Sequence, residues 1–305
     1  MQSLVWTGRL VSRVLWNSIN NFSTAPDPVV GKKLEPHLLS AVSGFPKNFT
    51  NTKLKKGKFG DDAWFSAKWK TSDVVGVADG VGGWRDYGID PGEFSSFLMK
   101  TCERFVSCGK FNSSDPSKLL ASSYYELFEN KQQIFGSTTA CIVVLNRDLN
   151  TIYTANIGDS GFVVVRHGKI VHKSEEQQHY FNTPYQLSIP PPPNHNNSVI
   201  TDSPESADTT NFRVEDGDVI LLATDGVFDN VPLQILLNEL TKLQGERDVL
   251  EIQKVANTIA LMARSLAFDA KFLSPFAKAA RKHGIGALGG KPDDITVLLG
   301  TVAFS

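Results

Sequence analysis

The chain has 305 residues, with 31 Lys and Arg against 32 Asp and Glu, a formal net charge of -1 and 41% hydrophobic residues. This balance excludes a dedicated nucleic-acid binder, because such proteins concentrate basic charge to neutralise phosphates. The composition is that of a globular protein long enough for a sizeable core. Three cysteines without CxxC spacing favour a reducing compartment. No apolar run approaches the length that a transmembrane helix needs, so no transmembrane segment is expected.

The N-terminal segment differs from the rest of the sequence. Residues 1–26 contain no Asp or Glu, and a helical projection places apolar residues on one side, with Arg9 and Arg13 on the other. An acid-free, basic amphipathic segment is typical of a mitochondrial transit peptide. The alternative is a disordered tail whose composition arose by chance. Residues 27–58, rich in proline and ending in a lysine cluster, are predicted to be a linker, and a catalytic domain is predicted over 59–305.

The first half of that domain is predicted to contain strands and two helices. Strands are expected at 63–69 and 74–78. Helices follow, one beginning at Pro91, a residue well tolerated in the first helical turn, and one at Ser117. Further short strands, separated by turn residues, predict an antiparallel meander; they lie at 139–145, 151–157, 162–166 and 169–172.

The second half begins with a segment in which no regular element is readable. Residues 174–208 are polar and proline-rich and are predicted to be a surface loop. Strands at 212–214 and 219–223 flank an acidic turn, which predicts a hairpin. Two helices at 232–243 and 249–267 and a strand at 295–302 complete the chain. This order of elements predicts an α+β domain with an antiparallel core.

Several apolar segments are followed or preceded directly by an acidic residue in a turn. The acidic residues are Asp79 before Gly80, Asp159, Asp225 before Gly226, Asp293, and the pair Asp61 and Asp62. One Asp-Gly pair is most often a plain turn. Together, however, these carboxylates are delivered to strand ends that can converge, and crowded carboxylates repel unless a cation lies between them.

The residue types in this set indicate which cation it would hold. Oxygen ligands without His or Cys suit Mg²⁺ or Mn²⁺. Two such ions can lower the pKa of a water molecule and stabilise both ends of a displacement at phosphorus. No covalent nucleophile is then required. None is evident either, because there is no GxSxG segment and Cys102 and Cys141 fall on apolar periods that predict core positions.

Six segments between residues 59 and 302 resemble, in order and spacing, the motifs of the metal-dependent Ser/Thr protein phosphatases of the 2C (PPM) family. They are GDDAWF (60–65), VADGVGGW (77–84), GSTTA (136–140), ANIGDSGF (155–162), ATDGVFDN (223–230) and KPDDITVLL (291–299). The stretch 79–95 and the acid-free leader are similar to the mitochondrial branch of that family, which acts on matrix phosphoproteins, including coenzyme Q biosynthesis proteins. The resemblance implies a four-layer αββα sandwich, two antiparallel β-sheets flanked by helices, with two Mn²⁺ or Mg²⁺ ions at one end.

The resemblance also implies a role for each main acidic residue. Asp79 would bridge both ions, with the Gly80 carbonyl on one of them. Asp225 and Asp293 would bind the other ion. The residues expected to act in catalysis are Asp79, Asp62 and Asp225.

The remaining acidic residues are expected to have supporting roles. Asp61 and Asp62 match an acidic pair that contributes to the site directly or through water. Asp159 and Asp229 match acids that can hold a weaker third ion. Asp294 stands where family members often have Asn and is expected to support the site or begin a strand.

Two positions depart from the family pattern. Val81 replaces a His that is proposed to protonate the leaving group, so a water molecule is expected in that role. An Arg that holds the substrate phosphate is also missing. Lys55, Lys56 and Lys58 stand in its neighbourhood and either act as point charges on phosphate or form a solvated surface run.

The leading prediction is therefore a protein-serine/threonine phosphatase of the mitochondrial matrix, with phosphorylated Ser/Thr proteins as its partners and with no nucleic acid. A rival from another class is a catalytically weak binding module that uses the same fold, which Val81 and the missing Arg favour. A phosphatase of small phosphometabolites would share the chemistry and differ only in its pocket.

Overall fold

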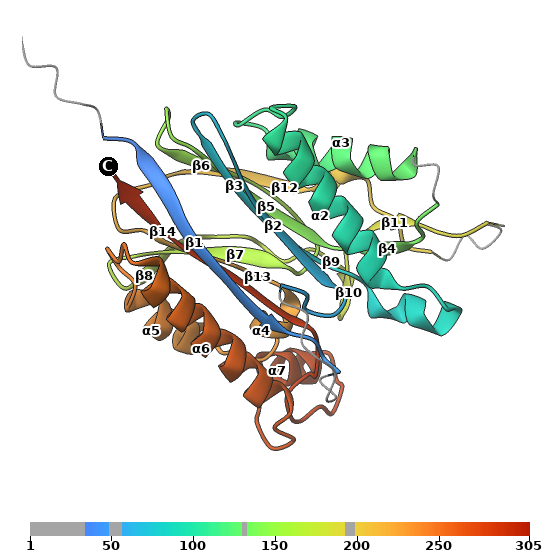
Figure 1. The fold of residues 1–305 in the computed structure, drawn as a ribbon. Coiled ribbons are helices and arrows are strands. Elements are labelled where there is room, and N and C mark those ends of the chain that lie inside the picture. The colour runs from blue at the N-terminus through green and yellow to red at the C-terminus, as the bar shows by residue number, and fades with distance from the viewer. Residues whose placement is uncertain (1–33, 49–56, 130–132, 193–198) are drawn as a thin grey trace, which may run out of the picture. The chain divides into compact units, whose positions relative to one another are not determined.

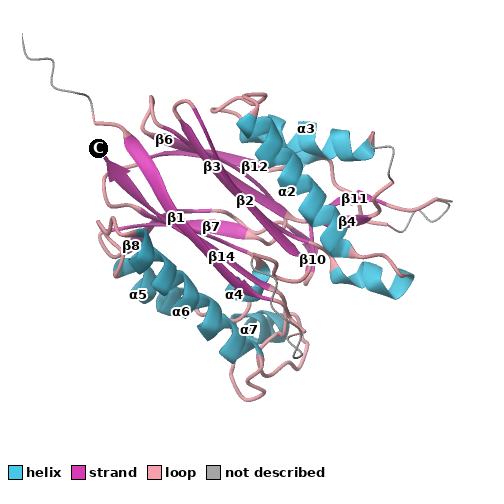
Figure 2. Ribbon diagram, viewed as in Figure 1, coloured by secondary structure: helices cyan, strands magenta, loops and turns pink. Residues whose placement is uncertain are grey.

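The structure is a computed structural model that describes residues 34–48, 57–129, 133–192 and 199–305. Residues 35–305 form one compact unit. In this unit two five-stranded antiparallel sheets pack face to face, and helices cover both outer faces (Figures 1 and 2). The predicted α+β fold with four αββα layers is therefore confirmed. No helix among the described residues has the length and apolar character needed to span a membrane.

One sheet has the strand order β12-β6-β5-β3-β2. Its strands are β2 (Asp62–Trp69), β3 (Ser72–Asp79), β5 (Ala140–Asn146), β6 (Thr151–Ile157) and β12 (Asp208–Arg213), and its covering helices are α2 (Pro91–Ser107) and α3 (Pro116–Phe128). Helix α2 begins as predicted, because Pro91 occupies the first turn and the Asp90 carboxylate accepts a hydrogen bond from the Gly92 N–H. This cap satisfies an amide that the helix itself leaves unpaired.

The other sheet has the strand order β1-β14-β13-β7-β8. Its strands are β1 (Pro36–Phe45), β7 (Gly161–Arg166), β8 (Lys169–Lys173), β13 (Val219–Ala223) and β14 (Ile295–Phe304), and its helices are α4 (Asp225–Phe228), α5 (Leu233–Thr241), α6 (Val249–Ala267) and α7 (Pro275–Lys282). The smaller elements are β4 (Gly136–Thr138), β9 (Gln178–Tyr180), β10 (Thr183–Pro184), β11 (Leu187–Ile189), η1 (Gly82–Tyr87) and η2 (Pro204–Ser206).

Three apolar cores hold these layers together. The central core lies between the sheets and contains alternate residues of β3 and β5, such as Val75 and Val143, against Phe162. The other residues of the same strands face α2 and α3. The third core joins the second sheet to α4, α5 and α6. Since both faces of the central strands are buried, these strands read as continuous apolar runs.

The prediction that 27–58 is a linker is wrong for residues 36–45. These residues form β1, which pairs along its whole length with β14, from Pro36 opposite Phe304 to Phe45 opposite Ile295. The alternation of polar and apolar residues in PHLLSAVSGF is weak, and the pairing partner lies at the far end of the chain. Residues 1–33, including the predicted leader, lie outside the described residues.

Two predicted strand pairings are also wrong. The meander ends at β6, because β7 lies in the other sheet. Likewise β12 pairs with β6 and β13 pairs with β7 and β14, so the turn at 215–218 joins two sheets and is not a hairpin. At both turns a short acidic segment carries the chain between sheets, which no local pattern distinguishes from a hairpin turn.

The prediction of a featureless loop at 174–208 is only partly right. The segment contains β9, β10, β11 and η2, and Gln186 and Leu187 are buried. Strand β11 pairs with β4, so it supports the GSTTA segment. The sequence prediction also omitted α7, although Ser274 caps it by accepting a hydrogen bond from the Ala277 N–H.

Candidate metal centre

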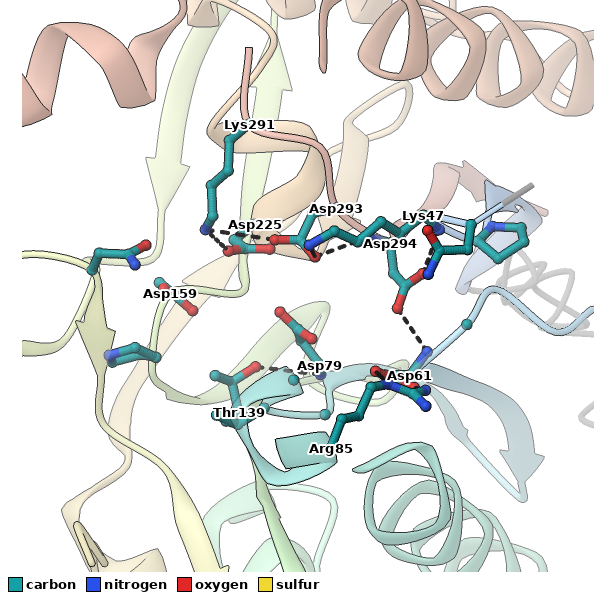
Figure 3. A pocket seen from close by; sticks show the side chains of 18 residues that line it. Lys47, Asp61, Asp79, Arg85, Thr139, Asp159, Asp225, Lys291, Asp293 and Asp294 are labelled. Carbon is teal, nitrogen blue, oxygen red and sulfur yellow. Dashed lines mark hydrogen bonds and ion pairs between the residues drawn. The ribbon is translucent and has the colours of Figure 1, made fainter. Parts of the chain in front are cut away.

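A pocket of about 640 Å³ opens at one end of the two sheets, where most of the predicted acidic residues converge (Figure 3). Its acidic lining residues are Asp61, Asp79, Asp159, Asp225, Asp293 and Asp294, and its basic ones are Lys47, Arg85 and Lys291. Asp79 approaches from one sheet, and Asp225 and Asp293 approach from the other (Figure 3). The convergence predicted from the sequence is therefore present.

Asp79 ends β3 and is fixed by the GSTTA segment. Its carbonyl oxygen accepts hydrogen bonds from Thr138 Oγ1 at 2.7 Å and from the Thr139 N–H at 2.9 Å. Its own N–H donates to Thr139 Oγ1 at 3.3 Å. These three bonds hold the backbone, so the Asp79 side chain is free to face the pocket. The two threonines are positioning residues whose role the sequence alone did not reveal.

The glycines after Asp79 and Asp225 are needed for close packing and not for turn geometry. Neither Gly80 nor Gly226 has a positive φ. A Cβ on Gly80 would lie 2.6 Å from the Pro91 carbonyl oxygen, and one on Gly226 would lie 1.9 Å from the Asp294 carbonyl oxygen. The explanation of these Asp-Gly pairs as plain turns therefore fails. Glycine is needed because another backbone segment passes too close to each position to leave room for a side chain.

Asp62 lies buried beneath the pocket, directly opposite Asp79 in the β2–β3 ladder. Its Oδ2 accepts hydrogen bonds from Thr224 Oγ1 at 2.8 Å and Thr296 Oγ1 at 2.7 Å. Its Oδ1 is buried without a hydrogen-bond partner. Burial, and then the nearby Asp294 carboxylate, raise the pKa of Asp62 well above its ordinary value.

Asp61 lies at the pocket rim and is held from two sides. Its carboxylate accepts hydrogen bonds from Arg85, one of them from Nε at 3.1 Å. Its N–H donates to Asp294 Oδ2 at 2.8 Å, while Asp294 Oδ1 accepts from the Lys47 N–H at 2.5 Å. Asp294 therefore clamps two backbone segments, which agrees with the supporting role expected for it.

Asp225 and Asp229 share a cation supplied by the chain. Lys291 Nζ donates to Asp225 Oδ2 at 2.5 Å and to Asp229 Oδ2 at 2.7 Å, and Asp293 Oδ2 is 3.7 Å away. Burial acts to raise the pKa of Asp225, but the opposing contributions, led by the charge and the hydrogen bond of Lys291, lower that pKa on balance. Asp229 lines a neighbouring cavity and not the main pocket; burial raises its pKa to about 7.

The donor set suits a hard divalent cation. Every acidic lining residue is an aspartate, and buried oxygens of Asp62 and Asp225 lack any hydrogen-bond partner. An unpaired buried carboxylate oxygen is costly unless a cation satisfies it. As the side chains stand, no three His, Cys, Asp or Glu residues in the described ranges are close enough together to hold an ion. Carboxylates that repel one another would be drawn inward by a cation.

The pocket offers no thiol or imidazole for catalysis. Cys102 and Cys141 are fully buried, as predicted, and burial raises the pKa of Cys102 to about 12. Val81 lines the pocket at the place where the family pattern has His, and none of the lining residues is a histidine. Chemistry at this site therefore has to come from carboxylates, cations and water.

Two cationic residues of the pocket were not predicted to contact its carboxylates or the phosphate. Arg85, whose side chain is 57% exposed, stands beside Asp61. Lys291 precedes Asp293 by two residues, so its place in the KPDD segment was the available signal. Of the lysines predicted to contact phosphate, Lys55 and Lys56 lie outside the described residues.

The half-buried carboxyl of Asp229 predicts a pH dependence in the absence of metal. Because its pKa is about 7 in the folded protein, the native state holds a proton that the unfolded chain releases above about pH 4. Folded-state stability should therefore fall as pH rises. In EDTA, the free energy of unfolding of the wild type should fall by about 3 kcal/mol between pH 5 and pH 8, relative to the change in Asp229→Asn over the same range. Urea unfolding at both pH values measures this difference; parallel pH profiles for the two proteins would contradict it.

Comparisons with known proteins extend over most of the chain. A profile of the family described as Protein phosphatase 2C matches residues 51–258. The Homo sapiens protein "Protein phosphatase PTC7 homolog" is 52% identical over 304 residues, 99% of each chain. The X-ray structure of the photosystem II phosphatase PBCP has a TM-score of 0.72 and 29% identity, covering 87% of this chain and 98% of that chain. The catalytic domain of the serine threonine protein phosphatase PstP, in complex with 2 manganese ions, shares the fold alone, with a TM-score of 0.53 and 14% identity over 88% and 99% of the two chains.

Proposed function

The chain belongs to the protein phosphatase 2C family, and on that premise we propose that it removes phosphate from Ser and Thr side chains of mitochondrial proteins, with two Mn²⁺ or Mg²⁺ ions held in the Asp79 pocket. Protein phosphatases of this family depend on such ions. The observation that carries the proposal is the meeting of Asp79, Asp225 and Asp293 from two sheets in one pocket. The two manganese ions of PstP support the number of ions.

The proposal assigns the ions to residues on two sides of the pocket. Asp79 and the Gly80 carbonyl stand on one side, with Asp225 and Asp293 on the other, and Asp61 and Asp62 support the first group. When bound, the ions would polarise a water molecule and neutralise charge on the phosphate. The chain itself aligns the carboxylates through the Thr138, Thr139 and Asp294 hydrogen bonds.

Arg85 is the phosphate-binding residue in this proposal. Its guanidinium reaches the pocket from η1 and already pairs with an anionic group, Asp61. A guanidinium binds phosphate in a bidentate manner that a lysine cannot reproduce. Since Val81 has no acidic proton, water supplies the proton for the leaving group.

The mitochondrial part of the proposal rests on the leader. Residues 1–26 are free of acids and carry arginines on one helical side, which is typical of a matrix transit peptide. The resemblance to the mitochondrial branch of the family supports matrix phosphoproteins, including those of coenzyme Q biosynthesis, as substrates.

The proposal is tested by hydrolysis of a phosphothreonine peptide by the full chain in MnCl₂ or in EDTA. We expect turnover with Mn²⁺ and none with EDTA. Parallel assays with free phosphothreonine and a sugar phosphate should be much slower if proteins are the substrates. A folded protein that shows no turnover with any divalent cation would favour the binding-module alternative, and faster turnover of the small phosphates would favour a metabolite phosphatase.

Replacement of Arg85 by Ala is expected to raise KM for the phosphopeptide and to lower kcat/KM by about 10- to 100-fold, the size of one or two charge-assisted hydrogen bonds. Arg85→Lys should recover part of the loss. Arg104→Ala, which removes an exposed arginine of α2, is the matched control. If Arg85 only steadies Asp61, the Mn²⁺ concentration needed for activity would rise while KM for the peptide stayed constant.

A further inference from the structure

Lys291 carries a positive charge into the inner wall of the acidic pocket. Only 18% of its side chain is exposed, and its ammonium group bonds to Asp225 at 2.5 Å and to Asp229 at 2.7 Å. The Nζ also lies 5.2 Å from the centre of the Phe276 ring, within cation–π distance. A buried ammonium is costly unless it is paired, and here it is paired on two sides.

The backbone of Lys291 is fixed independently of these charges. Its N–H donates to Asn230 Oδ1 at 2.8 Å, and its carbonyl oxygen accepts from Asn230 Nδ2 at 2.9 Å. The same Nδ2 donates to the Gly226 carbonyl at 2.9 Å, and Asn230 is fully buried. These hydrogen bonds connect the segment before β14 to α4. The backbone fold therefore positions the ammonium group beside Asp225 and Asp229.

We propose that Lys291 is a fixed internal cation that takes the place of a divalent ion on the Asp229 side of Asp225. The inference rests on the proposed function for the ions on the other side, between Asp79 and Asp293. It replaces the expectation that Asp159 and Asp229 hold a weak third ion. Figure 3 shows the Asp159 carboxylate at the same end of the pocket as the Lys291 ammonium, away from Asp294.

The charges explain why the lysine would keep an ion out. With Lys291 present, Asp225 and Asp229 already share a cation, and a divalent ion at the same place would meet its repulsion. Without Lys291, Asp225 and Asp229 would lose the cation that they share. Burial raises the pKa of Asp159, which lies near enough to both for their charges to raise it further. An all-oxygen set of this kind is what Mg²⁺ and Mn²⁺ take.

The test counts bound Mn²⁺ in the full chain and measures unfolding without metal. Lys291→Met keeps the length of the side chain and removes the charge, and Lys278→Met on α7, at an exposed position, is the matched control. We expect two Mn²⁺ per wild-type chain at saturation in native mass spectrometry and three per Lys291→Met chain. In EDTA, Lys291→Met should melt about 6 °C or more below wild type, because the buried Asp225 and the half-buried Asp229 lose their partner. Lys278→Met should match the wild type in both measurements.

A double variant keeps the inference testable if Lys291→Met alone is too unstable to measure. Lys291→Met with Asp229→Asn removes the charge and one of its partners, so it should regain most of the lost melting temperature and return to two ions. The inference is overturned if Lys291→Met binds no additional Mn²⁺, or if the double variant binds three. If the wild type bound no Mn²⁺ at all, the proposed function would fail, whereas the inference would still be decided by whether Lys291→Met alone acquires an ion.

Discussion

Asp79→Asn is expected to lower kcat/KM for a phosphothreonine peptide by about 1,000-fold, equivalent to about 4 kcal/mol of transition-state stabilisation. Asp79 faces Asp225 and Asp293 across the pocket, and the amide that replaces it is neutral. The hydrogen bonds to Thr138 and Thr139 use only the backbone of residue 79, so they survive the substitution. The loss should therefore appear in activity and not in folding.

The matched control is Asp86→Asn, which neutralises an exposed aspartate of η1 outside the pocket. Initial rates with increasing MnCl₂ separate two kinds of loss, because a weakened ion site is partly rescued by more metal. Removal of this half-buried carboxylate, which neighbouring carboxylates repel, should leave the melting temperature in EDTA equal to or above that of the wild type, since desolvation and Asp225 raise the pKa of Asp79 well above its ordinary value. Activity within tenfold of wild type would remove Asp79 from the catalytic site.

Gly226→Ala is expected to have the largest effect on stability. The added methyl group would lie 1.9 Å from the carbonyl oxygen of Asp294, a backbone atom at the start of β14 that cannot move aside as a side chain can. Overpacking against a rigid partner costs about 3 kcal/mol or more. For a domain of this size that corresponds to a melting temperature about 6–12 °C lower. Activity should fall as well, because Asp225 and Asp293 flank the displaced segments.

Gly286→Ala provides the comparison for this substitution. A Cβ at Gly286 meets nothing within 4 Å, and its φ is not positive. Differential scanning calorimetry of both variants should therefore show a large shift for Gly226→Ala and almost none for Gly286→Ala. Equal melting temperatures would mean that the segment before β14 yields easily, contrary to the tight approach seen here.

The order of strands and helices was predictable because the elements carry strong local periodicity. Strand 219–223 and helix 249–267 were placed at the bounds that the structure shows. Pairing between strands was less predictable. Strands β6 and β7 are separated by a turn that resembles a hairpin but crosses between sheets, and β1 has a weak pattern and a distant partner.

The acidic part of the site was predictable, because the positions of charged residues can be read directly from the sequence. Aspartates at strand ends indicated a cation, and the structure brings Asp79, Asp225 and Asp293 to one pocket. The bland alternative, that each Asp-Gly is a simple turn, could be rejected only once the contacts of Gly80 and Gly226 were known. The pairing of Lys291 with Asp225 and of Arg85 with Asp61 was not predicted, because a cation within an acidic cluster has no signature apart from its neighbours in space.

The pairing of β1 with β14 has a consequence for how the chain folds. The strand that follows the N-terminal segment hydrogen-bonds to the last strand, so that sheet closes only after the whole polypeptide is available. A chain threaded through a membrane with its N-terminus leading would remain open until its final residues had crossed. If residues 1–26 are the transit peptide proposed above, its removal would have to stop before Pro36, because a later cut would strip β14 of its outer neighbour β1 and leave a bare sheet edge, which invites aggregation.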